Sequence, residues 1–373
     1  MRHHLIFFAL LFTFSVNAQL FDNAKNTSLV KKGVDYVYNM QPDSALIYID
    51  SIESVLPQHP VVPLLRALNV LWSSMPNVTE DSTFAIFTNH LYETVRLAGR
   101  IDGERQEHPE AIFFEIAARG LLAEYYADAD FFMKAITEAG KAYNLLRPVS
   151  QLTAVNPDFY LPIGVYNYFR EKYPERHPTY KPLLWFFRSG DVELGISQVK
   201  QACEHAILTK VEAYIYLSYI YLRYEELPEL AQTYLLDLSK IYPNNHYVVS
   251  KYLESLEGGD DFEKAPLFMI NQLLSIDQPY YRLAGNSFMG LYAEKVNNDN
   301  SEAIRYYNKS ISLEKRTQRE PDYYLSISHL GLSRIFMKMK NLDKAIYHAR
   351  EALSYSETKE IEQESKAILY RLE

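Results

Sequence analysis

The stretch HLGLSRIFMKMKNLDKAIYHAREAL, residues 329–353, predicts two helices joined by a short turn. The turn reads Asn341-Leu342-Asp343 and places polar, turn-forming residues before the second helix. Ala345, Ala349 and Ala352 then follow at steps of four and three, which puts them on one helix face. Because side chains this small allow a neighbouring helix to approach closely, the stretch predicts a tightly packed helical hairpin.

The same combination of small and aromatic residues returns elsewhere in the chain. The first clear unit has Gly33, Tyr36, Ala45 and Pro57, separated by 3, 9 and 12 residues. Three further units share a small or aromatic residue followed by an alanine: Tyr126, Ala135, Ala139 and Ala142; Ser218, Tyr221, Ala231 and Pro243; and Tyr292, Ala303, Tyr307 and Ser310. About seven or eight helix pairs, irregularly spaced, would account for the chain.

These units resemble the tetratricopeptide repeat, a pair of antiparallel helices of about 34 residues. Residues 186–202, FFRSGDVELGISQVKQA, are also weakly similar to the tetratricopeptide-39/inclusion-body-clearance family. The resemblance implies an all-α fold, a right-handed solenoid of helix pairs forming a single domain over residues 19–373. Solenoids need a polar helix at their open end, and residues 358–373 fit such a capping helix. A helical bundle without repeats is the competing interpretation.

Composition and motifs argue against several kinds of function. The formal net charge of −9 disfavours a nucleic-acid partner. After residue 18, the two closest histidines are 18 residues apart, so no local zinc motif exists. The sequence has no Walker phosphate loop, no dinucleotide glycine fingerprint and no Gly-x-Ser-x-Gly motif. We expect Cys203 to be a packed, inert thiol. These patterns predict a protein without catalytic residues, cofactor or metal.

The N-terminus predicts export. Arg2 precedes an apolar run at 5–16, and small residues lead to a cleavage site after Ala18. We therefore expect residues 1–18 to be a signal peptide, and the mature chain to contain no membrane-spanning segment. The single cysteine, Cys203, is far from that site, which argues against a lipoprotein. The predicted location is the periplasm or the exterior of the cell; the oligomeric state is left open.

Residues 156–190 depart most from the repeat pattern and are rich in aromatic and basic side chains. Prolines at 162, 174, 178 and 182 are expected to break the helix here. One interpretation is an insert that packs its rings onto the helices. The other is a binding patch, because tyrosine, tryptophan and arginine are enriched at binding hot spots. The residues of that candidate patch are Tyr166, Tyr168, Arg170, Arg176, Lys181 and Trp185.

Tetratricopeptide arrays bind partners along a groove lined by the first helix of each pair, and the resemblance implies matching positions here. These positions are Tyr219, Arg223, Asn286, Glu294, Arg334 and Lys338. The full set of residues that clamps a peptide carboxylate in some members is not matched. The leading hypothesis is an exported, non-enzymatic scaffold that holds a protein or peptide in this groove. The alternative is an α/α-type glycan-binding protein or envelope hydrolase that uses residues 156–190.

Overall fold

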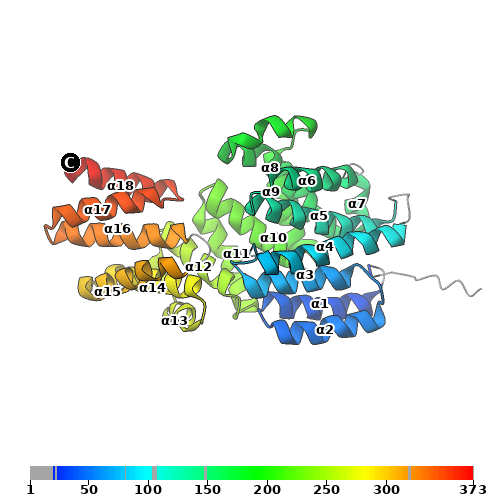
Figure 1. Ribbon diagram of the computed structural model, residues 1–373, viewed down its shortest axis with the longest axis horizontal. Helices are drawn as coiled ribbons and strands as arrows, with labels where there is room; N and C mark the ends of the chain where they lie inside the picture. The colour runs from blue at the N-terminus through cyan, green and yellow to red at the C-terminus, as the bar shows by residue number, and fades with distance from the viewer. Residues whose placement is uncertain are drawn as a thin grey trace, which may run out of the picture.

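The computed structural model describes residues 20–21, 23–79, 81–102, 107–146, 149–317 and 321–372, so the predicted signal peptide lies outside the described residues. Within them the secondary structure is entirely helical, as predicted, and includes eighteen α-helices (Figure 1). In chain order they are α1 (Ala24–Tyr38), α2 (Pro42–Val55), α3 (Val61–Ser74), α4 (Asp81–Asp102), α5 (Pro109–Asp128), α6 (Phe132–Leu146), α7 (Val149–Val155), α8 (Tyr160–Arg176), α9 (Val192–His205), α10 (Lys210–Tyr219), α11 (Pro228–Ile241), α12 (His246–Gly258), α13 (Leu267–Ser275), α14 (Pro279–Lys295), α15 (Asn300–Leu313), α16 (Asp322–Lys338), α17 (Leu342–Ser354) and α18 (Lys359–Leu372).

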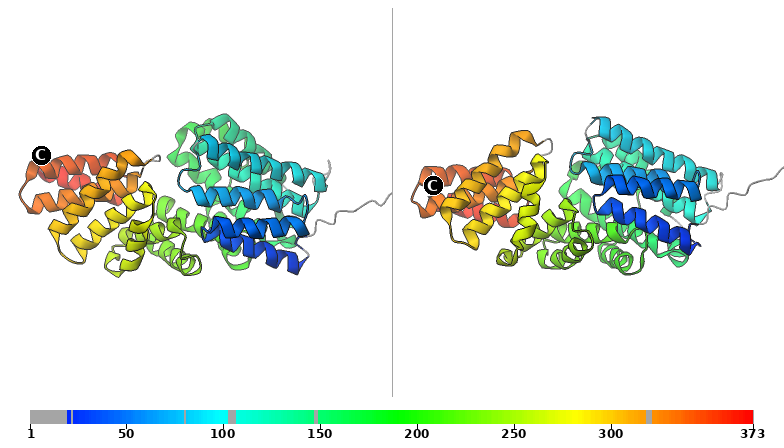
Figure 2. Two further views of the ribbon diagram at one scale, coloured as in Figure 1. Left: turned by 60° about the horizontal axis from the view of Figure 1, so that its bottom comes forward. Right: turned by 90° about the horizontal axis from the view of Figure 1, so that it is seen from below.

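The helices pack as consecutive antiparallel pairs, and the most extensive contacts are those of α5 with α6, α8 with α9, α14 with α15, and α16 with α17, while α4 contacts α3 and α5 to the same extent. Alternate helices also touch, as α12 does with α14 and α14 with α16. This order of contacts is consistent with a helical repeat. Figure 2 shows α14–α18 at one end of the molecule and α1–α9 at the other, with α11 and α12 between them.

Small residues at the predicted positions lie inside the helix pairs. Ala45, Ala231, Ala303 and Ala345 are fully buried, and Ala135 is 4% exposed. The last pair shows the consequence, because the Ser333 hydroxyl of α16 donates to the carbonyl oxygen of Ala345 in α17 at 2.8 Å. Such a contact between a side chain and a helix backbone requires the two helices to be close. The prediction of tightly packed pairs, made from the alanine spacing, is confirmed.

The chain also curls back on itself, so that α1 contacts the segment between α11 and α12. Asn245 donates from Nδ2 to the backbone oxygen of Tyr38 at 2.7 Å, and the Tyr242 hydroxyl donates to Asp35 at 2.8 Å. These partners are 207 residues apart in the sequence. Tyrosine–carboxylate hydrogen bonds of this kind recur through the molecule: Tyr38 with Glu212, Tyr168 with Glu225, Tyr307 with Glu294, Tyr323 with Glu257, and Tyr355 with Glu314.

The segment 156–190 differs from the expectation that its prolines break the helix. Residues 160–176 form the regular helix α8, which pairs with α9. Pro162 lies in the first turn, where a backbone N–H has no partner within the helix, and Pro174 lies in the last turn. The remainder contains a 3₁₀ helix, Pro178–Phe186, whose Tyr180 ring contacts Phe132 of α6. The helix series therefore continues through the first half of this segment.

Among the described residues, no helix combines the length and the apolar composition that a membrane span requires.

Candidate functional site

Largely buried charges pair helices of the C-terminal half with one another in two sets, and the first set centres on Arg223. This arginine is 8% exposed and lies in the π-helical turn Ile220–Tyr224 that continues α10. It pairs with Glu254 of α12, which is 2% exposed and also accepts from Lys251 Nζ at 2.8 Å. A second carboxylate, Glu357, lies 3.2 Å from the Arg223 guanidinium in the turn before α18. Arg223 thus connects the end of α10 to α12 and to the turn that precedes α18.

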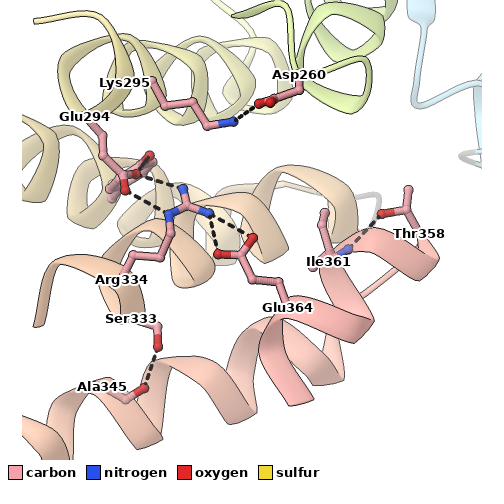
Figure 3. Close-up of polar contacts among 10 residues, drawn as sticks. Asp260, Glu294, Lys295, Ser333, Arg334, Ala345, Thr358, Ile361 and Glu364 are labelled. Atoms are coloured by element: carbon pink, nitrogen blue, oxygen red, sulfur yellow. Dashed lines mark hydrogen bonds and ion pairs between the residues drawn. The ribbon is translucent and has the colours of Figure 1, made fainter. Parts of the chain in front are cut away.

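The row continues at Arg334 of α16. Its Nε and Nη2 atoms donate to the two oxygens of Glu294 in α14, both at 2.8 Å (Figure 3). Glu294 also accepts from the Tyr307 hydroxyl of α15 at 2.8 Å. The third guanidinium nitrogen of Arg334, Nη1, lies 3.4 Å from both oxygens of Glu364 in α18. We call Arg223, Glu254, Glu294, Arg334 and Glu364 the charged row.

The electrostatics of the row follow from burial and pairing. Burial alone would raise the pKa of Glu294, but the hydrogen bonds and charge of Arg334 outweigh it and hold the pKa below its ordinary value. The pKa of Glu254 is lowered in the same way, because Arg223 and Lys251 outweigh its burial. Both carboxylates are therefore ionised at neutral pH. Removing charges from water is costly, so each pair depends on its partner remaining in place.

Helix α18 is fixed across the row at several points along its length. Lys359 Nζ lies 2.8 Å from Glu226, in the turn after α10, and Glu364 faces Arg334. Its apolar face is buried at Ile361 and Ile368, which are 2% and 5% exposed. The sequence predicts a capping helix at 358–373; the helix spans Lys359–Leu372 and packs on α17 and α16. It also makes polar contacts as far back along the chain as α10.

A hollow of about 220 Å³ lies between the C-terminal turns of α16 and α18. Its lining is formed by Arg334, Met337, Lys338, Glu364, Ala367, Ile368 and Arg371. Lys338 and Arg371 are exposed, and neither forms an ion pair with any part of the chain that the structure describes. The hollow therefore has three cationic side chains and one carboxylate in a chain of net charge −9.

The six groove positions expected from sequence separate into three groups. Glu294, Arg334 and Lys338 come together at the C-terminal end of the row, where Arg334 and Lys338 line the hollow. Tyr219 and Arg223 line a shallow recess with Tyr247 and Lys251, and Tyr219 is 41% exposed. Asn286 is 1% exposed, and its Nδ2 atom donates to the backbone oxygen of Arg282 at 2.6 Å within α14. Its side chain is therefore buried and does not face a groove.

The candidate patch in residues 156–190 divides into packed and exposed side chains. Tyr168 is fully buried and donates to Glu225 at 2.6 Å. Tyr166 stacks on Tyr143, with ring centroids 5.0 Å apart. Arg170 donates to the backbone oxygens of Leu184 and Phe187. The Arg176 guanidinium lies over the Tyr224 ring.

By contrast, Lys181 is exposed and Trp185 is 85% exposed. Four of the six patch residues thus take part in intramolecular contacts, whereas Lys181 and Trp185 face solvent.

Sequence reasoning missed Glu254, Glu364 and Arg371, although they belong to the row or the hollow. The available signal was weak, because a charged residue on an amphipathic helix usually faces solvent. These carboxylates differ from ordinary surface carboxylates only in their partners. Glu254 pairs with Arg223, 31 positions earlier, and Glu364 pairs with Arg334, 30 positions earlier.

Within the described ranges, no cluster of three or more histidine, cysteine or acidic side chains could hold a metal ion. Cys203 is buried as expected, and burial raises the pKa of its thiol to about 12. In comparisons with known proteins, no family model matches the sequence and no curated protein matches it either.

Proposed function

We propose that the chain is a non-enzymatic scaffold, exported to the periplasm or secreted, that holds a partner protein or peptide along the first helices of its pairs. In this proposal the pairs form a tetratricopeptide-like right-handed solenoid. The partner lies against α10, α12, α14 and α16, beside the charged row. The observation that supports this most strongly is the row itself, in which one ion pair connects the α10 turn to α12 and a second set connects α14, α16 and α18.

The physical argument concerns the cost of those charges. A buried ion pair adds little stability compared with apolar side chains of similar size, since desolvation offsets the attraction. Exposed aromatic side chains and complementary charges are, however, common features of recognition sites, and both occur beside the row. Tyr219 and Lys338 provide an exposed ring and an exposed cation at opposite ends of the row. A partner segment that contacts both would cross α10 to α16.

The proposal can be tested by site-specific photo-crosslinking in the native cell. A photo-crosslinking amino acid replaces Tyr219 or Lys338 on the first helices, or Lys309 of α15 and Tyr347 of α17 on the second helices. All four positions are exposed. We expect one discrete protein adduct from the first-helix positions and none from the second-helix positions, with the same adduct formed at Tyr219 and Lys338.

The outcome that contradicts the proposal is equally specific. Adducts that form at all four positions alike, or only at Lys309 and Tyr347, would place any partner on the other face. Fractionation of the same cells tests export, because the scaffold is expected in the periplasmic or secreted fraction with its first residues removed.

A second candidate function rests on Trp185. A tryptophan that is 85% exposed offers a flat apolar face, and the exposed Lys181 lies four residues earlier in the same 3₁₀ helix. These side chains suit stacking on a sugar ring in a cell-envelope glycan. Trp185→Ala should then abolish retention on envelope glycan, whereas Phe268→Ala, which removes another exposed ring, should leave it intact. Equal retention of both variants would exclude this function.

A further inference from the structure

The hollow between α16 and α18 presents more positive charge than its own carboxylate neutralises. Arg334, Lys338 and Arg371 line it, and Glu364 is the acidic side chain in the lining. Arg334 is paired with Glu294 outside the hollow. Among the described residues, no carboxylate lies within ion-pair distance of Lys338 or Arg371, although Lys338 attracts Glu294 at longer range. Unpaired cations that converge on one hollow favour an anion there.

Arg334 is held in position to receive such an anion. Glu294 binds its Nε and Nη2 atoms at 2.8 Å, which fixes the plane of the guanidinium. The remaining nitrogen, Nη1, has Glu364 at 3.4 Å, a distance at the long end for a hydrogen bond (Figure 3). Glu364 thus satisfies Nη1 only weakly, and a better placed carboxylate could displace it.

The rest of the lining is apolar. Met337 of α16 and the neighbouring residues Ala367 and Ile368 of α18 complete it. The hollow is open to solvent, and its volume of about 220 Å³ leaves room for a short alkyl group. The ligand that fits these properties is a carboxylate attached to a short apolar group.

We propose that this hollow binds a carboxylate on a short apolar stem, supplied by an acidic side chain within an otherwise apolar partner segment. Arg334 Nη1, Lys338 and Arg371 hold the carboxylate, and Met337 and Ile368 contact the stem. Glu364 competes with the incoming carboxylate for Arg334. The identity of the source as a partner segment rests on the proposed scaffold function, whereas the chemistry of the hollow does not.

The test uses the purified full chain and sodium hexanoate as the probe, with hexanamide as the uncharged control. Methyl NMR signals of Met337 and Ile368 report on the hollow. We expect hexanoate to shift both signals saturably, and hexanamide to shift them at least tenfold less at equal concentration. Lys338→Gln and Arg371→Gln should each weaken hexanoate binding at least fivefold, and Glu364→Gln should tighten it at least twofold.

The matched control is Lys366→Gln, which removes a positive charge from the same helix. Lys366 pairs with Glu362 and is not part of the lining, so hexanoate binding should stay unchanged. Equal shifts with hexanamide, or equal affinity in Lys338→Gln, Arg371→Gln and Lys366→Gln, would overturn the proposal. If hexanoate binds but no partner is photo-crosslinked, the proposed scaffold function is wrong and the proposed carboxylate site stands. If a partner is crosslinked but hexanoate does not bind, the proposed carboxylate site is wrong and the scaffold function stands.

Discussion

The Tyr307 ring of α15 lies directly against Gly331 of α16, so closely that a Cβ at position 331 would overlap the ring. On the other side, a Cβ at Gly290 of α14 would lie 2.5 Å from the same ring. Tyr307 is fully buried and its hydroxyl donates to Glu294. Two glycines therefore create the space for the ring that connects three helices and supports one end of the charged row.

Gly331→Ala should destabilise the protein by about 1–3 kcal/mol, because the added methyl group forces the Tyr307 ring to move within a packed interface. Urea denaturation measures the free energy of unfolding. The control is Gly120→Ala in α5, where a Cβ would meet no atom within 4 Å. That substitution should stabilise the protein by up to about 1 kcal/mol, since alanine favours a helix over glycine. The same sign for both variants would contradict this packing.

Arg334→Gln should destabilise the protein by about 3–5 kcal/mol, because it leaves Glu294 buried without its cation. The double variant Glu294→Gln/Arg334→Gln should recover part of that loss, since neither residue then holds an unpaired charge. Free energies of unfolding for both single variants and the double variant complete the mutant cycle. Strict additivity would mean that the two 2.8 Å contacts contribute no coupling energy.

Glu110→Gln should loosen the first described residues of the chain. Glu110 is 3% exposed, accepts from the backbone N–H groups of Leu20 and Phe21 at 2.8 and 3.1 Å, and contacts His59 Nε2 at 2.5 Å. Loss of a charged acceptor here should destabilise the protein by about 2–3 kcal/mol. Limited proteolysis should then cleave near residue 20 sooner than in the parent protein or in Glu107→Gln, which alters an exposed carboxylate.

Stability should fall as the pH is lowered from about 6.5 to 4. The rings of His329 in α16 and His348 in α17 meet with their Nδ1 atoms 2.9 Å apart. Burial, followed by the charge of His348, lowers the pKa of His329 to about 4; burial and Lys344 lower the pKa of His348 to about 4 as well. The fold thus favours the neutral rings, whereas the unfolded chain binds protons already near pH 6.5.

The expected loss of unfolding free energy is about 2 kcal/mol between pH 6.5 and pH 4, and it disappears above about pH 7.5, where the unfolded rings are neutral as well. Measurement of unfolding free energy against pH in the parent protein and in His329→Gln separates this effect from the titration of other groups. His205→Gln is the control, because His205 lies at the surface of α9. A pH dependence identical in His329→Gln and His205→Gln would show that the histidine pair does not cause it.

The sequence by itself determined that the chain is helical and that consecutive helices pair, although it did not predict helix α8. Ala345, Ala349 and Ala352 recur with the helical period, and that period alone decides which helix face can accept a close neighbour. The six groove positions were partly informative, because Glu294, Arg334 and Lys338 do lie together. Asn286, by contrast, is buried between helices. Its position in the repeat fits a side chain that faces the groove equally well as one that faces the neighbouring helix.

The tertiary structure alone decided which charges meet. Arg223 and Glu357 are separated by 134 positions, and Asn245 and Tyr38 by 207, yet each pair is in contact. Local sequence cannot predict such partners, because they depend on how many intervening helices pack together. Whether a charged side chain on a helix faces water, closes an ion pair or lines the hollow is therefore set by the path of the whole chain.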